Sequence, residues 1–372
     1  MTPKASLTSS PAPDALPNNL WRQQFRKKLH GWYARHARDL PWRRRSDAYA
    51  IWVSEIMLQQ TQVATVAPYF ERFLAAFPTI AALAAADRQQ VLRLWEGLGY
   101  YRRARQLHDA AAAIVRDHAG QFPREEQAVR RLPGIGRYTA GAILSIAFDA
   151  RQPILEANTL RLWCRLLGYR GDPRSASGQQ LLWATAEMSL PRRGSGTFNQ
   201  ALMELGSQVC LPRGPRCEDC PVALLCRARA EQAQAEIPPL QVKPAPEARH
   251  EVALVIRRGR KVLLLECPHG GRWAGLWDFP RYRVHSQTEA DLPAKLAEAV
   301  RNETGVVVRP GRRLATFKHS VTRFRITLDC YEAGYVSGPA GRTELRSMQW
   351  LEPTQLDGYP LCTTGRKICR FL

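Results

Sequence analysis

Apolar residues recur at three- and four-residue spacing through the first part of the chain, and Pro and Gly separate the runs. This spacing places apolar side chains on one face of a helix. It predicts helices at Ile80–Trp95, Ala104–Val115, Thr139–Phe148 and Leu181–Met188. Because few runs alternate with period two, we expect residues 20–229 to form an all-α region.

The pattern changes to that of strands in the last third of the chain. Short runs rich in β-branched residues predict strands at Val252–Ile256, Val262–Glu266, Val306–Val308, Phe324–Tyr331 and Met348–Leu351. One helical run, Leu292–Glu303, lies among them. We therefore expect a second, smaller α+β domain over residues 251–372.

Two further segments have neither pattern. Residues 230–250 contain four prolines and no Phe, Trp or Tyr, which is typical of a stiff linker between domains. Residues 1–19 are rich in Pro, Ser and Thr, and we expect a disordered tail without the apolar core of a secretory signal. No run approaches the roughly 20 apolar residues of a membrane span. We expect a cytoplasmic monomer with no membrane partner.

The chain carries 54 Lys and Arg against 33 Asp and Glu, a formal net charge of +21. A surplus of this size favours a polyanionic partner such as DNA, RNA or an anionic membrane. An arginine-rich surface that serves no partner is the plainer alternative. The net charge therefore favours a nucleic-acid partner but does not establish one.

Four of the nine cysteines fall close together, in the spacing Cys210-x6-Cys217-x2-Cys220-x5-Cys226. In a reducing compartment such thiols are metal ligands more often than disulfides. Zinc accepts four thiolates, and a [4Fe-4S] cluster is also held by four cysteines from a compact loop. The spacing predicts a metal site and leaves both possibilities open. The other five cysteines show no such spacing, and we expect buried thiols.

Two Gly-x-Gly turns are candidate contacts to a nucleic-acid backbone. Gly134 and Gly136 precede a helical run, so their backbone amides can approach a phosphate at its positive end, where Arg137 adds charge. An ordinary turn between helices is the alternative. In residues 96–105, two tyrosines and three arginines adjoin a second such turn. Tyr100 is the tyrosine that we expect to stack on bases.

These motifs together resemble one family. The segment WVSEIMLQQT at residues 52–61, GLGYY at 97–101, the hairpin at 132–140 and the cysteine loop at 210–226 resemble the helix-hairpin-helix DNA glycosylases of base-excision repair. Among these, the adenine DNA glycosylase (MutY) family is the most similar, and its C-terminal domain is Nudix-like. The resemblance implies a [4Fe-4S] cluster, and double-stranded DNA with adenine opposite 8-oxoguanine or guanine as substrate.

The resemblance also implies catalytic roles. Glu55 corresponds to the general acid that protonates adenine, and Glu156 to the carboxylate that faces the sugar, with Asn158 beside it. Tyr138 stands where bifunctional relatives carry a lysine that forms a Schiff base, so a monofunctional enzyme is implied. The residues that match contacts to the base or the surrounding stack are Trp42, Arg43, Gln60, Leu98, Tyr100 and Glu204.

Three features depart from the family pattern. The family usually has Asp-Gly where this chain has Glu156-Ala157, and the added methylene moves the carboxylate by about an ångström, a displacement that can cost about a hundredfold in rate. We favour a compensating backbone shift over a slow enzyme or altered chemistry. Of the Nudix box only Glu303 and Gly305 match, so we expect no pyrophosphatase activity.

The third departure lies in the lesion-reading loop, where Val321-Thr322-Arg323 stands in place of Phe-Ser-His. Thr322 can replace a serine hydroxyl, and Arg323 can supply a cationic donor to 8-oxoguanine. Two alternatives follow from these departures: a diverged glycosylase with altered base or lesion specificity, and a lesion-binding protein without efficient cleavage. The retention of both Glu55 and Glu156 argues against the second.

Overall fold

The computed structural model describes residues 16–239, 244–268, 270–284, 291–339 and 347–372. These residues form two compact units. The first comprises residues up to 84 together with 109–239, and the second comprises residues 85–108 and the described residues from 244 onwards. The tail expected at residues 1–19 lies largely outside the described residues, and helix α1 begins at Asn19.

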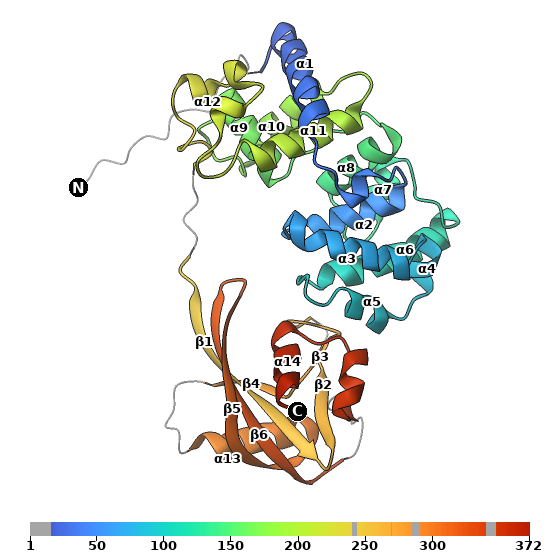
Figure 1. The fold of residues 1–372 in the computed structure, drawn as a ribbon, viewed down its shortest axis with the longest axis vertical. Coiled ribbons are helices and arrows are strands. Elements are labelled where there is room, and N and C mark those ends of the chain that lie inside the picture. The colour runs from blue at the N-terminus through green and yellow to red at the C-terminus, as the bar shows by residue number, and fades with distance from the viewer. Residues whose placement is uncertain (1–15, 240–243, 269, 285–290, 340–346) are drawn as a thin grey trace, which may run out of the picture. The chain divides into compact units, whose positions relative to one another are not determined.

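The first unit is all-helical (Figure 1), as its hydrophobic spacing predicted. Its helices are α1 (Asn19–His36), α2 (Ala48–Leu58), α3 (Val63–Ala76), α4 (Ile80–Ala85), α7 (Glu126–Arg131), α8 (Arg137–Phe148), α9 (Ala157–Leu167), α10 (Ala176–Ser189), α11 (Ser195–Gln208) and α12 (Arg227–Ala230). In sequence, α5 (Arg88–Leu94) and α6 (Arg102–His118) lie between α4 and α7.

One helix of the first unit is buried on every side. In α2, all residues from Tyr49 to Met57 are buried, and α2 packs against α8 and α3. A helix that is apolar all round belongs in the interior of a domain. Glu55 is the one charged residue of this helix, so its position brings a carboxyl group into the core.

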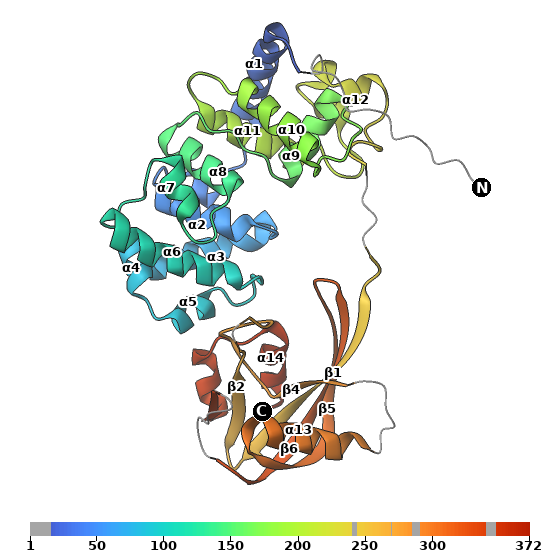
Figure 2. The ribbon, with the colours of Figure 1, turned by 180° about the vertical axis from the view of Figure 1, so that it is seen from behind.

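A separate hydrophobic cluster joins α1, α9, α10 and α11, which lie together in Figures 1 and 2. Trp163 of α9 is fully buried there and packs on Phe25 of α1, with ring centroids 5.3 Å apart. Val222 and Ala228, from the cysteine loop and α12, belong to the same cluster. This packing fixes the start of α9, where Glu156 lies, and the end of α11, where Cys210 lies.

The helix predicted over Ile80–Trp95 is two helices instead. Helix α4 ends at Ala85, and α5 starts at Arg88 after Asp87, whose carboxylate accepts a hydrogen bond of 2.9 Å from the backbone N–H of Gln89. Aspartate before the first helical residue is a strong N-cap. The prediction of one helix was wrong because the three- and four-residue spacing of apolar residues continues across this break.

The second unit contains a mixed sheet of β1 (Glu247–Arg258), β2 (Lys261–Glu266), β3 (Trp277–Asp278), β4 (Arg281–Val284), β5 (Val307–Val321), β6 (Phe324–Ser337) and β7 (Met348–Leu351). The central order is β3-β2-β1-β6-β5, with β4 paired to β1 and β7 to β2. Strands β1 and β6 run parallel, and the other pairs are antiparallel.

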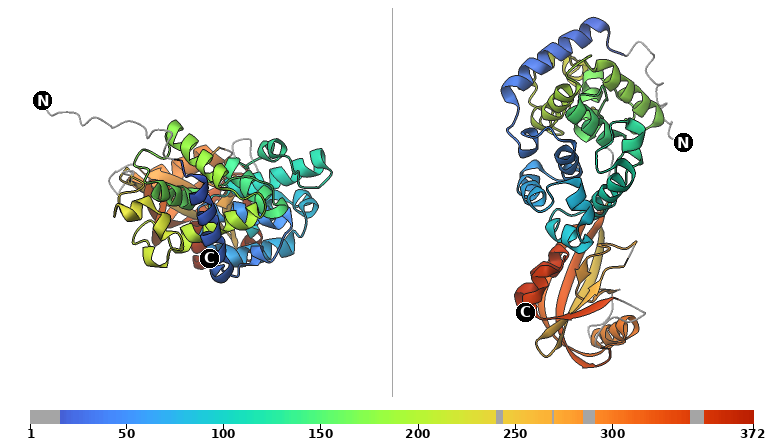
Figure 3. Two further views of the ribbon diagram at one scale, coloured as in Figure 1. Left: turned by 90° about the horizontal axis from the view of Figure 1, so that it is seen from above. Right: turned by 90° about the vertical axis from the view of Figure 1, so that its right-hand side faces the viewer.

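Both faces of this sheet are covered. On β1, Val252, Leu254 and Ile256 face the cluster that includes α13 (Leu292–Thr304), whereas Ala253 and Val255 face the cluster that includes α14 (Thr363–Ile368). The right-hand view of Figure 3 shows α13 and α14 on opposite sides of the strands. The period-two pattern of β1 therefore separates two cores, as expected for a strand.

Strand boundaries were the weakest part of the sequence prediction. Strand β5 extends over 15 residues rather than the three of Val306–Val308, because its many exposed basic residues hide the alternation. The short β3 and β4 were missed, and residues 247–250, assigned to the linker, already belong to β1. Among the described residues, no helix is both long and apolar enough to span a bilayer.

Candidate active site

The carboxyl group of Glu55 lies in the interior of the first unit. Glu55 is only 6% exposed, and burial raises its pKa to about 7, with a further increase from the charge of Glu156. The Tyr138 hydroxyl donates a hydrogen bond of 2.7 Å to Glu55 Oε2, and this bond partly offsets the increase. A carboxyl group with a pKa near neutrality is suited to general acid catalysis.

Glu156 is the N-cap of α9. Its Oε2 accepts a hydrogen bond of 2.7 Å from the backbone N–H of Asn158, and its Oε1 accepts one of 2.8 Å from that of Thr159. The Thr159 hydroxyl accepts a hydrogen bond from the Glu156 N–H and completes a capping box. Burial raises the pKa of Glu156, and the two backbone N–H groups oppose that effect. The longer side chain thus folds back onto its own helix.

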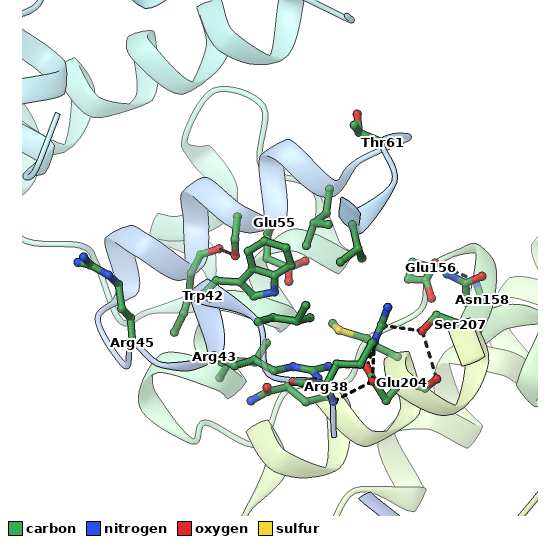
Figure 4. Close-up of a pocket in the computed structure, with 18 of the residues that line it drawn as sticks. Arg38, Trp42, Arg43, Arg45, Glu55, Thr61, Glu156, Asn158, Glu204 and Ser207 are labelled. Carbon is green, nitrogen blue, oxygen red and sulfur yellow. Dashed lines mark hydrogen bonds and ion pairs between the residues drawn. The ribbon is translucent and has the colours of Figure 1, made fainter. Parts of the chain in front are cut away.

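Glu55 and Glu156 line the same cavity, which has a volume of about 370 Å³. Figure 4 shows the two carboxyl groups approaching the cavity from different elements, Glu55 from α2 and Glu156 from the start of α9. Tyr138 and Asn158 line it as well. The structure therefore brings the four predicted catalytic residues together, although they span more than 100 positions of the sequence.

A buried ion-pair network forms another wall of this cavity. Glu204 has no exposed surface. Its Oε1 accepts from Arg38 Nε at 2.7 Å, and its Oε2 accepts from Arg43 Nη2 at 2.7 Å and from Arg38 Nη2 at 2.9 Å (Figure 4). Burial tends to raise the pKa of Glu204, but the two arginines outweigh it and lower the pKa. Both oxygens are therefore committed to arginines in this conformation.

Sequence reasoning missed two residues of this network, Arg38 and Ser207. Arg38 Nη2 also donates to the Ser207 hydroxyl at 3.0 Å. Neither residue belongs to a recognisable motif, and Arg38 is 166 positions from its partner Glu204. The remaining predicted residue here, Trp42, is buried and packs edge-on against Phe70.

The predicted hairpin leads into α8. Gly134, Gly136 and Arg137 are all exposed, and Gly136 is the N-cap of α8. The Arg137 guanidinium lies over the Trp183 ring, 3.9 Å from its centroid, so the indole orients this cation beside the helix N-terminus. Gln60, at the end of α2, is exposed and has a φ of 59°, a conformation that L-residues adopt only when their surroundings hold them there.

Leu98 and Tyr100, both predicted to contact the base stack, lie in the turn after α5 in the second unit and differ in exposure. Tyr100 is 52% exposed, whereas Leu98 is buried. At the hairpin between β5 and β6, the Thr322 hydroxyl donates a hydrogen bond of 2.7 Å to the carbonyl of Val321, and the Arg323 guanidinium lies 5.0 Å from the centroid of the Phe324 ring. Arg323 is therefore the free donor of the pair in this conformation.

The four cysteines of the predicted metal site line one small cavity between α9 and the loop after α11. All nine cysteines are free thiols. Arg165 Nη1 donates to Cys210 Sγ at 3.3 Å and to the Leu211 carbonyl at 2.7 Å. Within the described part of the chain, no three His, Cys, Asp or Glu side chains are grouped to hold a single metal ion.

Comparison with known proteins gives consistent matches. Residues 53–187 match the HhH-GPD superfamily of base excision DNA repair proteins, and residues 251–370 match the NUDIX domain. The adenine DNA glycosylases of Rattus norvegicus and Homo sapiens are each 33% identical over 93% of this chain, and the matches cover 77% and 73% of those proteins. The chain belongs to the adenine DNA glycosylase family.

A solved structure is similar to part of this chain. A thermostable thymine-DNA glycosylase is similar with a TM-score of 0.53 and 28% identity, covering 57% of this chain and 98% of that chain. The resemblance to adenine DNA glycosylases and the fold class predicted from the sequence, a helical region followed by a Nudix-like domain, are thereby confirmed.

The two residues of the Nudix box that match the family pattern, Glu303 and Gly305, lie in and just after α13. Tyr282 donates a hydrogen bond of 2.9 Å to Glu303, and Gly305 ends α13 with a φ of 73°.

Proposed function

We propose that this protein is a monofunctional DNA glycosylase that removes adenine opposite 8-oxoguanine or guanine. The observation that supports this most directly is the shared cavity of Glu55, whose pKa is raised to about 7, and Glu156. Hydrolysis of a glycosidic bond needs one carboxylic acid to protonate the leaving group and one carboxylate near the sugar. The relatives are named as adenine DNA glycosylases, and this supports adenine as the leaving group.

The reaction begins with extrusion of the adenine from the duplex into the cavity. Tyr138 occupies Glu55 Oε2, which leaves Oε1 to carry the proton to the base. As the C–N bond breaks, positive charge develops on the sugar and Glu156 stabilises it. Each Glu156 oxygen already accepts one backbone N–H, and a carboxylate oxygen has a second lone pair for the sugar. Water then completes the hydrolysis.

The wall opposite Glu55 recognises the base. Glu204, Arg38 and Arg43 form a fixed array of donors and acceptors, and Trp42 adds an apolar surface. Binding of adenine by Glu204 requires one arginine to release a carboxylate oxygen. Arg43 is the partner with a single hydrogen bond to Glu204, so we propose that Arg43 moves towards the base while Arg38 keeps Glu204 in place.

Contacts to the duplex come from both units. Gly134, Gly136 and Arg137 bind a phosphate at the start of α8, where the helix dipole and backbone N–H groups favour an anion. Gln60 and Tyr100 contact the stack around the mispair, with Tyr100 as the exposed aromatic residue, whereas Leu98 of the same turn is buried in this conformation. Arg323, with Thr322 behind it, donates to the base opposite the adenine.

Cys210, Cys217, Cys220 and Cys226 hold a [4Fe-4S] cluster. In such a cluster each cysteine binds a different iron, so the sulfurs surround a volume rather than converge on one point. Four cysteines line one cavity, and the resemblance to the helix-hairpin-helix glycosylases favours a cluster over zinc. All four cysteines lie in the loop of residues 210–226, so a bound cluster would crosslink this loop on itself beside α9.

The test is release of the free base from duplexes with adenine opposite 8-oxoguanine, guanine, cytosine or thymine. We expect release opposite the first two, no strand cleavage without added alkali, and loss of at least a hundredfold in rate for Glu55→Gln. Base release that Glu55→Gln leaves unchanged contradicts the assignment of the acid. Tight binding to these mispairs without release favours the lesion-binding alternative.

A further inference from the structure

The turn that carries Tyr100 is built around a buried cation. Arg103, in the first turn of α6, is buried, and its Nη2 donates to the carbonyls of Leu98 and Gly99, both at 3.2 Å. A buried guanidinium is tolerated only where acceptors satisfy its N–H groups. The carbonyls of Leu98 and Gly99 provide two such acceptors for Nη2, so the turn and the cation stabilise each other. Burial lowers the pKa of Arg103 to about 10, and the side chain remains charged at neutral pH.

The same guanidinium supports the aromatic ring of Tyr100. Its central carbon lies 5.6 Å from the centroid of the Tyr100 ring and 5.3 Å from that of Trp95, both within the range of cation–π attraction. The indole N–H of Trp95 donates a hydrogen bond of 3.1 Å to the Gly99 carbonyl. Arg103 and Trp95 thus hold both the backbone of the turn and the ring that projects from it.

Tyr100 needs such support. Its φ of 45° is one that residues other than glycine rarely adopt, and it follows Gly99 with a φ of 71°. A strained conformation of this kind persists only where the surrounding structure determines it. More than half of Tyr100 is nevertheless exposed, at 52%. An aromatic side chain that is both exposed and fixed loses little conformational entropy when it inserts into a base stack.

We propose that Arg103 is a positioning residue for DNA recognition. It holds the turn at residues 97–101 and the ring of Tyr100 in the conformation that enters the stack beside the mispair, and it contacts no nucleotide itself. The proposal rests on the proposed function, because it takes Tyr100 as a contact to the base stack. It assigns to Arg103 the role of a pre-organising cation rather than of a phosphate-binding arginine.

The test is a double-mutant cycle between Arg103 and Tyr100 in the full chain. The probe is a duplex with 8-oxoguanine opposite a 2′-fluorinated adenosine, which resists loss of the base, and an undamaged duplex is the reference. We expect Tyr100→Ala to weaken binding to the mispair about tenfold, as loss of one stacked base contact does. Arg103→Met weakens it nearly as much in the wild type, and by less than twofold when Tyr100 is already alanine.

Arg102→Met is the matched control, because Arg102 is the exposed neighbour in the same turn of α6. We expect it to weaken binding to both duplexes equally, by the same factor with or without Tyr100. If Arg103→Met also weakens binding to both duplexes equally, by the same factor with or without Tyr100, the proposal for Arg103 is overturned and the proposed function stays intact. A wild type that binds both duplexes equally contradicts the proposed function instead.

Folding is checked separately by circular dichroism and by affinity for the undamaged duplex. If Arg103→Met does not fold, the cycle is run with Arg103→Lys, which keeps the charge but loses the planar fork that reaches two carbonyls. The same coupling to Tyr100 is then expected. Independent effects of Arg103→Lys and Tyr100→Ala overturn the proposal.

Discussion

Tyr138, in the first turn of α8, donates a hydrogen bond of 2.7 Å to Glu55 in the middle of α2. Burial raises the pKa of both groups, to about 7 for Glu55 and well above its ordinary value for Tyr138. Tyr138 is therefore a neutral donor across the physiological range. Glu55 is therefore the group of this pair that exchanges a proton near pH 7. Tyr138 has no amine that could form a Schiff base, which is consistent with the proposed monofunctional glycosylase.

This relationship predicts the pH dependence of the chemical step. In the proposed mechanism the acid form of Glu55 is the active one, so we expect the single-turnover rate of base release to fall as pH rises through about 7. The proposed mechanism uses Glu156 as the anion, and because burial raises its pKa we expect the rate to fall on the acid side as well. We expect a bell-shaped profile, measured by rapid quench. The residual rate of Glu55→Gln lacks the alkaline limb, and a wild-type rate that increases above pH 7 contradicts the assignment.

The same pKa predicts that Glu55 destabilises the fold at alkaline pH. Its pKa in the folded state is raised from 4.5 to about 7, so its contribution to stability is fully present below about pH 4.5 and is lost as pH rises through 7. At pH 8 the loss is at most about 3 kcal/mol. Glu55→Gln, which keeps an acceptor for Tyr138, should be more stable than wild type at pH 8 and similar to it near pH 5.

Urea unfolding of both proteins at the two pH values measures this difference. Glu187→Gln is the matched control, because Glu187 is exposed on α10 and its substitution should change stability equally at both. A Glu55→Gln variant that is less stable than wild type at pH 8 contradicts the prediction.

The sequence predicted the parts of this site that depend on local pattern. Glu55 was identified through the segment WVSEIMLQQT, which resembles the family motif, and the cysteines because four fall within one short loop. Arg38 could not be found in this way, since its partner Glu204 is remote in sequence and no motif joins them. The capping of α9 by Glu156 was also missed, because it depends on where the helix starts.

In the second unit, the same limit applied to strands. Strand β1 was predicted because both of its faces are buried and apolar, whereas most of β5 is exposed or half-buried and carries several basic residues. Hydrophobic alternation reports burial rather than extended backbone. A strand whose partners supply hydrogen bonds without covering its side chains therefore escapes detection, as β5 beyond Val308 did.

The proposed metal site predicts a specific response to loss of one cysteine. Cys217→Ser removes one of the four thiolates around the cavity, so we expect less iron and acid-labile sulfide per chain and weaker visible absorbance than in the wild type. Cys369→Ser, outside that cavity, should keep both at the wild-type level. A colourless wild type with one zinc per chain contradicts the proposed cluster.

The capping of α9 by Glu156 predicts how this departure from the usual aspartate affects the enzyme. Aspartate is also a good N-cap, so Glu156→Asp should melt within a few degrees of the wild type. Aspartate is shorter by one methylene, and with the backbone shift that we favour, which would place the glutamate carboxylate correctly, we expect the single-turnover rate of Glu156→Asp to fall about tenfold. Glu156→Ala should lose most of the rate and about 1 kcal/mol of stability with the cap.

Ser175→Ala separates the two effects. Ser175 is the N-cap of α10, where its hydroxyl accepts a hydrogen bond of 3.1 Å from the backbone N–H of Gly178. Ser175 does not line the cavity, so its loss should lower stability by a similar amount without changing the rate of base release. If Glu156→Asp is faster than the wild type, the glutamate is poorly placed and the backbone has not compensated for its length. A slower Glu156→Asp with unchanged melting supports a cavity that has adapted to the longer side chain.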